Sequence, residues 1–195
     1  DYIVYSLVSV QYNNKTMDKY PYRKINDEIM INYYIAVDCI KDYNEYFNGT
    51  QAQIHIDQDI LKLWGINEED LYNIASINTP KLFPPKLLNF TDLYEITENR
   101  LSEENKFIFK EIEDHMHIVT NDTNRNGACA IIYPGFLNVL KLGLPDFYIC
   151  PSSIHECLLI SKNIASIDKI NETISFVNAN YVEPSEILSS KIINL

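Results

Sequence analysis

Residues 146–160, DFYICPSSIHECLLI, contain two apolar runs separated by a short polar segment. FYIC and ECLLI are rich in aromatic and aliphatic residues, which favours strands. The serines between them favour a turn, because their hydroxyls can replace missing backbone partners. The stretch therefore predicts an antiparallel hairpin with its loop at 152–155. In that register Cys150 pairs with Cys157, and both strands are buried.

The loop of this hairpin also holds most of the candidate catalytic side chains. A hydrolase-type site would combine a serine nucleophile with a histidine base and a carboxylate. Neighbouring residues of an extended ribbon point to opposite sides, however, which separates His155 from Glu156. The sequence also has no Gly-x-Ser-x-Gly elbow, and we favour a plain polar turn. The candidates for catalysis are Ser152, Ser153, His155, Glu156 and Arg125.

Two cysteines of the hairpin and two histidines upstream of it are the candidate metal ligands. Paired across the strands, Cys150 and Cys157 would form a disulfide or half of a metal site. His115 and His117 are the nearest further ligands, because H-x-H on a strand puts both rings on one face. The acidic residues of EIED (111–114) precede them. We favour buried thiols beside a solvated charged turn, and expect neither a metal nor a cofactor.

The N-terminal part of the chain predicts strands alternating with short helices. Asp57 and Gly65 are typical of the start and the end of one helix. Asn67 is the expected N-cap of the next, which ends before Pro80 because proline clashes with a preceding helical turn. The expected strands are 3–10, 28–40 and 52–56, and the expected helices are 13–20, 58–65 and 68–78.

The C-terminal part predicts a second set of strands and helices. Pro134 is expected to break the helical run 127–143 in two or to kink it. Isoleucines three or four residues apart, with Ser166 or Asp168 near the start, predict an amphipathic helix over 166–180. Residues 80–114 contain a Pro-Pro pair and a charged middle, which indicates a connector with a helix over 102–112. The expected strands are 116–122, 147–150, 156–160 and, at an edge, 189–195.

The two parts share one order of elements, which predicts an internal repeat. Residues 2–77 and 116–180 each give strand, helical segment, strand, turn, strand and helix. We therefore expect an α+β fold of two similar β-α-β-β-α units with mostly antiparallel sheets. The expected division is a first half at 1–79, a connector at 80–114 and a second half at 115–195.

The formal net charge of −11 constrains what the chain binds. A strongly acidic surface repels phosphate backbones, so we expect no direct binding to nucleic acid. No apolar run reaches the roughly 18 residues of a bilayer span, and no signal peptide opens the chain, so we expect no membrane contact. The cysteines lie in apolar stretches, as reduced thiols of a cytoplasmic protein do. They are Cys39, Cys129, Cys150 and Cys157.

With no complete catalytic constellation, the sequence favours a non-enzymatic module that binds another protein through an acidic, tyrosine-rich surface. A specific version is an inhibitor of a nucleic-acid-binding defence protein, in which carboxylates take the place of phosphates. A hydrolase with a polar site around 152–156 is the alternative. The tyrosines that favour contact are Tyr20, Tyr22, Tyr33, Tyr34, Tyr43 and Tyr46, although burial of Tyr33 and Tyr34 in a strand is an equal alternative.

Four blocks of the chain resemble, in order, bacterial proteins of the domain of unknown function 5688 family. They are LKLWGINEEDLYNIASINTPKLFPP (61–85), NRNGACAIIYPGFLNVL (124–140), DFYICPSSIHECLLI (146–160) and VNANYVEPSEILS (177–189). The W-G-x-x-E-E-D-L helix is also distantly similar to the domain of unknown function 1444 family.

This resemblance implies a cytoplasmic protein of Gram-positive anaerobes, encoded on a mobile element or a phage, with a further N-terminal segment before residue 1. It supplies no activity and no catalytic residue. Family members carry aliphatic residues at the positions of Cys150 and Cys157, which implies a core role for both thiols.

Overall fold

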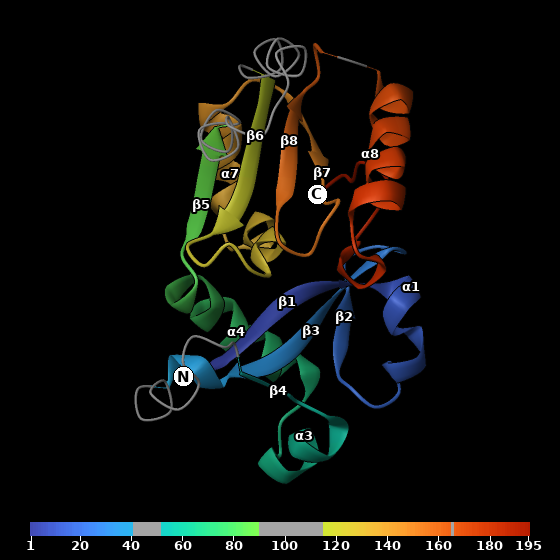
Figure 1. Cartoon of the computed structure of the whole chain (residues 1–195). Helices are drawn as coiled ribbons and strands as arrows, with labels where there is room; N and C mark the ends of the chain where they lie inside the picture. Colours follow the sequence, from blue (N-terminus) through green and yellow to red (C-terminus); the bar gives the residue numbers. More distant parts are fainter. Residues whose placement is uncertain (41–51, 90–114, 165) are drawn as a thin grey trace. The chain divides into compact units, whose positions relative to one another are not determined.

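The computed structural model describes residues 1–40, 52–89, 115–164 and 166–195. The chain divides into two compact units, Asp1–Pro84 and Pro85–Leu195. Each unit contains an antiparallel four-stranded sheet with helices, so the fold is α+β (Figure 1). The predicted helix at 102–112 lies outside the described residues.

The first unit is built around β3, Ile29–Ala36, which lies within the strand expected at 28–40 and is buried on both faces. It pairs on one side with β1, Ile3–Ser9, over its whole length. On the other side it pairs with two short strands in succession, β2 (Tyr22–Lys24) and β4 (Gln53–His55). The 3-10 helix η2 (Val37–Cys39) ends the strand earlier than predicted.

The helices of the first unit begin where their capping residues predict. The side chain of Asp57 accepts from two backbone amides at the start of α3 (Gln58–Trp64), and Gly65 ends it with φ 67°. Asn67 forms a capping box with α4 (Glu68–Leu82). The helix expected at 13–20 lies earlier in the chain, as α1 (Val10–Asn13) followed by the 3-10 helix η1 (Asn14–Thr16), and residues 17–20 are not helical.

The prediction that α4 ends before Pro80 is wrong, because the helix runs on to Leu82. Its last turn is held against the outer edge of β1. The Thr79 hydroxyl accepts from the Tyr5 amide (3.1 Å), and the Asn78 side chain donates to the Ile3 carbonyl (3.1 Å). The helix therefore satisfies backbone groups of β1 that no strand pairs.

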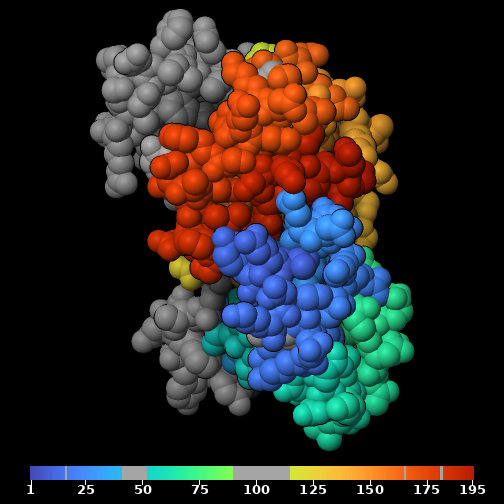
Figure 2. Space-filling view, turned by 90° about the vertical axis from the view of Figure 1, so that its right-hand side faces the viewer, coloured from blue at the N-terminus to red at the C-terminus, as the bar shows by residue number. Residues whose placement is uncertain are grey.

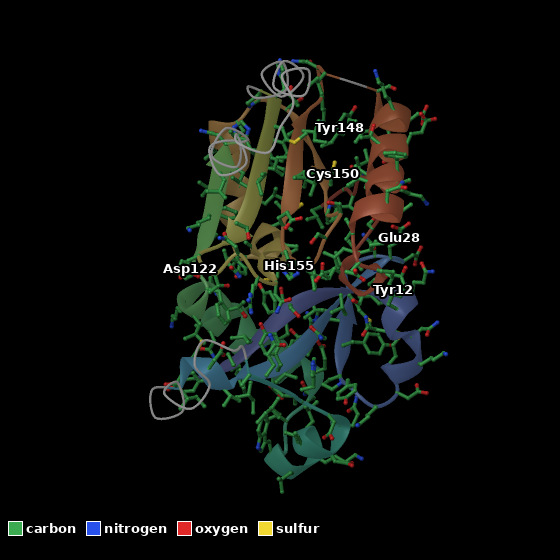
Figure 3. All side chains as sticks on the ribbon, viewed as in Figure 1. Tyr12, Glu28, Asp122, Tyr148, Cys150 and His155 are labelled. Atoms are coloured by element: carbon green, nitrogen blue, oxygen red, sulfur yellow. The ribbon has the colours of Figure 1, made fainter. Side chains whose placement is uncertain are left out.

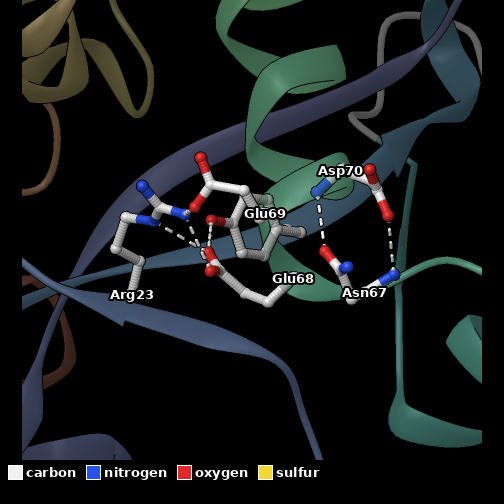
Figure 4. A network of polar contacts seen from close by, with 6 residues as sticks. Arg23, Asn67, Glu68, Glu69 and Asp70 are labelled. Atoms are coloured by element: carbon white, nitrogen blue, oxygen red, sulfur yellow. Dashed lines mark hydrogen bonds and ion pairs between the residues drawn. The ribbon is translucent and has the colours of Figure 1, made fainter.

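The first turn of α4 is joined to the sheet by a network around Glu68 (Figure 4). The Arg23 guanidinium donates two hydrogen bonds to Glu68, at 3.0 and 2.9 Å, and also contacts Glu69. The Tyr33 hydroxyl donates to the same Glu68 carboxylate. Burial, and then the bond to Glu68, raise the pKa of Tyr33 above its ordinary value, while Arg23 also covers the ring of Tyr72 at 4.0 Å.

The sheet of the second unit has the order β5-β6-β8-β7. The strands β6 (Met116–Asn121), β7 (Phe147–Cys150) and β8 (Cys157–Ser161) lie where the sequence predicts strands. The edge strand β5, Pro85–Asn89, lies inside the expected connector and pairs with β6. The sequence does not predict this strand, because most of its residues are exposed and it forms only by pairing with β6.

Helical segments flank the sheet of the second unit. On one side, α8 (Ile167–Tyr181) has Ser166, one of the two residues expected near its start, as its N-cap, and packs Ile170 and Ile174 against the sheet. Its outer surface and the C-terminal segment are seen in orange and red in Figure 2. The 3-10 helix η5 (Gly127–Ile132) lies beside β6 and β8, and α7 (Phe136–Gly143) follows a break that includes Pro134, as predicted.

Two predictions about the second unit are corrected. The expected strand at 189–195 is absent from the described residues, where only the single bridge Ile149–Ile193 joins this segment to β7. The units also differ in pairing. In the first, β1 pairs with the next predicted strand, β3, whereas in the second β6 pairs with the later strand β8. The structure does not show them as copies of one another.

Candidate functional site

The hairpin at 146–160 forms, but in a register shifted by one residue. Cys150 pairs with Leu158, so the predicted pairing of Cys150 with Cys157 is wrong. The loop is held from outside, since the Ile154 amide donates to the Glu186 carbonyl (2.8 Å) and the Ile154 carbonyl accepts from the Ala128 amide (3.2 Å). Tertiary contacts, rather than a tight turn, set its length.

The shift places the two thiols on opposite faces of the sheet, because side chains alternate along a strand. Cys150 packs against Ile170 and Ile174 of α8 (Figure 3). Cys157 pairs with Val119 and lies on the other face. All four cysteines are in the described part, and none forms a disulfide. The proposed cross-strand disulfide or shared metal site is therefore inconsistent with the geometry.

Burial also makes these thiols poor nucleophiles. It raises the pKa of Cys150 and of Cys129 to about 12, and that of Cys157 well above its ordinary value. The thiolate is the reactive form. We expect Ellman's reagent at pH 8 to label Cys39 alone in the folded protein, and all four thiols after unfolding. Rapid labelling of two or more thiols in the native protein would contradict these placements.

The histidines proposed as metal ligands do not gather with the cysteines. His115 and His117 border a small hollow with Phe147 and Leu159. His117 lies on β6, where it pairs with Leu159. Among the described residues, no group of three or more His, Cys, Asp or Glu side chains is placed to hold a metal ion. The acidic residues at 111–114 lie outside the described part.

His155, labelled in Figure 3, is the best-positioned of the catalytic candidates, and both of its ring nitrogens already have partners. Nδ1 accepts from the Asn126 amide at 3.2 Å. Nε2 lies 3.3 Å from a carboxylate oxygen of Glu186. This assigns the proton to Nε2 and leaves neither nitrogen directed at a substrate. Glu186 lies 31 positions further along the chain, so no local motif predicts it.

The two serines and Glu156 play different parts in the loop. The buried Ser153 hydroxyl accepts from the His155 amide at 3.0 Å. Ser152 instead borders an apolar groove beneath α8. Burial raises the pKa of Glu156, an effect that His155 and Ser153 reduce and Glu186 increases. Ser153 and His155 therefore meet through the loop backbone, while Ser152 lies apart.

Arg125 belongs to a tight turn that positions Asn126 for its contact with His155. The Asn121 side chain donates to the Arg125 carbonyl at 2.8 Å and accepts from the Thr123 amide at 3.0 Å. Asn124 and Asn126 adopt positive φ, 54° and 51°, which asparagine tolerates better than most residues. The Arg125 residue itself is exposed.

Gly127 follows this turn and touches β6 directly. A β-carbon there would lie 2.2 Å from Thr120 Oγ1 and 2.7 Å from both the Asn121 amide nitrogen and the His155 carbonyl oxygen. The Thr120 hydroxyl donates to that same carbonyl at 2.9 Å. The candidate catalytic loop is thus a packed junction between β6, η5 and the 151–156 loop.

A second candidate site lies in the first unit, where residues of β1, β2, β3 and β4 meet the segment before β2. It is an aromatic pocket with a volume of about 200 Å³. The rings of Tyr20 and His55 lie 5.8 Å apart, and burial lowers the pKa of His55. The sequence predicts Tyr20 and Tyr22 as contact residues, but no sequence motif indicates that His55 lies beside them. The pocket is lined by Val8, Asn13, Met17, Tyr20, Pro21, Tyr22, Met30, Asn32, Tyr33 and His55.

The other tyrosines singled out from the sequence are placed differently. Tyr33 and Tyr34 are buried on β3, and the Tyr33 hydroxyl is engaged by Glu68. Tyr43 and Tyr46 lie outside the described residues. Of the aromatic residues that line the pocket, Tyr33 is buried and bound to Glu68, whereas Tyr20, Tyr22 and His55 are not fully buried.

Comparison with known proteins gives one match. The profile of a family described as "Family of unknown function (DUF5688)" matches residues 1–193. No curated protein and no solved structure matches the chain. In the part of the chain that the structure describes, no helix is long and apolar enough to cross a bilayer.

Proposed function

Since the chain belongs to the DUF5688 family, whose function is unknown, we propose its function from its own residues: it is a cytoplasmic, non-enzymatic module that binds another protein. The observation that carries this proposal is the aromatic pocket of the first unit. Clustered aromatic rings around a concave site are typical of interface hot spots. The pocket is proposed to receive a basic side chain of the partner.

Cations already lie over tyrosine rings in this unit. Lys19 Nζ is 5.0 Å from the centre of the Tyr20 ring, and the Arg23 guanidinium is 4.0 Å from that of Tyr72. Such contacts contribute roughly 0.5–2 kcal/mol each. The same chemistry suits a lysine or arginine of a partner entering between Tyr20 and Tyr22.

The charge of the first unit supports a basic partner. Residues 1–84 contain twelve Asp and Glu against seven Lys and Arg, and residues 90–114 contain eight against three. The rest of the chain is almost neutral, with seven acidic and six basic residues. Uneven charge along the chain steers a basic partner toward its acidic stretches. Proteins that bind nucleic acids present basic surfaces. The partner that we propose is a defence protein of this class.

The geometry of His155 favours binding over hydrolysis. A general base needs a nitrogen within reach of the proton it removes, whereas here the Asn126 amide and the Glu186 carboxylate occupy both. The loop residues instead hold elements of the second unit together.

The test compares pocket variants with a surface tyrosine. Tagged full-length chain, with the tag at either end, is used to capture partners from bacterial lysate, and the affinity for the purified partner is then measured. Tyr20→Ala and Tyr22→Ala are expected to weaken binding roughly tenfold or more. Tyr12→Ala is the matched control, because Tyr12 is 48% exposed and lies outside the pocket lining (Figure 3).

The pH dependence gives a second readout. Because the pKa of His55 is lowered, this ring is neutral at pH 7 and gains charge only as the pH falls below its ordinary range near 6.5. A cationic guest should therefore bind more weakly at acidic pH, and His55→Gln should reduce that dependence. The proposal fails if no specific partner is captured, or if both pocket variants bind as the wild type does.

A further inference from the structure

A second concave site lies in the second unit, between α8 and the sheet, and it is almost entirely apolar. The groove has a volume of about 370 Å³, within the range of roughly 300–1,000 Å³ typical of small-molecule sites. Leu158 and Ile160 of β8 form one wall, with Met116 at the start of β6. Residues of α8, Ile170 and Ile174 among them, form the other.

The floor of this groove belongs to the core, whereas its rim is exposed, with Ile164 at 37% and Val177 at 39%. Ile160 is 7% exposed, and Ile170 and Ile174 are 5% exposed each. The same isoleucines pack with Cys150, and the groove lies beside this cluster. Concave apolar surface with an exposed rim is typical of ligand-binding grooves, so a groove of this size favours a guest.

The polar groups at the groove indicate what kind of guest fits. The Thr173 hydroxyl already donates to the Lys169 carbonyl at 2.9 Å. Ten of the described residues line the groove, and Lys169 is the only ionisable one among them. It lies in the first turn of α8, where the helix dipole also favours an anion. A peptide would leave backbone groups without partners against these walls. An aliphatic chain with one anionic end would not.

We propose that this groove binds a free aliphatic carboxylic acid, with the chain between β8 and α8 and the carboxylate at Lys169. Burial of each methylene contributes to affinity, and the charge pair fixes the orientation of the chain. This site is separate from the aromatic pocket of the first unit, and the proposal does not depend on a protein partner.

The test uses dodecanoate and its uncharged analogue dodecanol, each displacing a fluorescent fatty acid from the full-length protein. Wild-type protein is expected to bind dodecanoate. Lys169→Gln should weaken dodecanoate binding roughly tenfold and leave dodecanol binding unchanged. Thr173→Trp places a large ring in the groove from an exposed position of α8 and should abolish binding of both.

Two variants on α7 serve as controls. Lys141→Gln removes a lysine outside the groove, and Val139→Trp adds a ring at a position that is 64% exposed; both should bind as the wild type does. Thermal unfolding verifies that each variant is folded. The proposal is overturned if the wild type binds no dodecanoate, if folded Thr173→Trp still binds it, or if Lys169→Gln weakens acid and alcohol equally.

Discussion

Replacement of Gly127 by alanine is expected to destabilise the second unit by about 3 kcal/mol or more. The new methyl group would lie 2.2 Å from the Thr120 hydroxyl oxygen and 2.7 Å from two backbone atoms, of Asn121 and His155. A side-chain hydroxyl can rotate away, but two backbone positions cannot both yield without moving η5 from β6. The hydrogen bond from the Asn126 amide to His155 should be lost with it.

The effect is measured as the change in the free energy of unfolding in urea, monitored by a spectroscopic signal that reports on the second unit. Gly143→Ala is the matched control, because nothing lies within 4 Å of a β-carbon at that position at the end of α7. It should leave the free energy of unfolding unchanged or slightly higher, since alanine has the better helix propensity. Equal stability of the two variants would show that the junction around Gly127 is looser than the structure indicates.

Replacement of Glu68 by alanine is expected to lower the stability of the first unit by about 2–3 kcal/mol. The change removes the acceptor of two Arg23 hydrogen bonds and of the Tyr33 hydroxyl. The Arg23 and Glu68 side chains are 28% and 30% exposed, so solvent offsets part of the cost of a fully buried pair. The phenol and the guanidinium nevertheless lose their shared partner.

Glu69→Ala is the control for this variant. Glu69 also contacts Arg23, but its side chain is 65% exposed, so its removal should cost less than about 1 kcal/mol. Thermal unfolding of both variants, in low and in high salt, separates the buried contribution from the screened one. A loss at Glu69 as large as that at Glu68 would contradict the central place of Glu68 in the network.

Local chemistry in the sequence predicts much of this fold. Asp57, Gly65, Asn67 and Ser166 mark helix ends through the backbone groups that they satisfy or the φ that they allow. The apolar runs of β3, β7 and β8 likewise predict strands, because burial on both faces leaves little other choice.

The features that the sequence conceals depend on contacts between distant segments. The register of the 146–160 hairpin is set by Ala128 and Glu186, which hold Ile154 from elsewhere in the unit. The last turn of α4 persists beyond Pro80 while Thr79 is bound to β1. The partner of His155, Glu186, and the companion of Tyr20, His55, are likewise brought close only by the fold.

The contact of α4 with β1 has a consequence for self-association. An open strand edge recruits strands from other molecules, and this is how ordered aggregates extend. In the first unit, Thr79 and Asn78 occupy the Tyr5 amide and the Ile3 carbonyl on that edge. Polar side-chain atoms of α4 thus block part of the β1 edge against pairing with strands of other molecules.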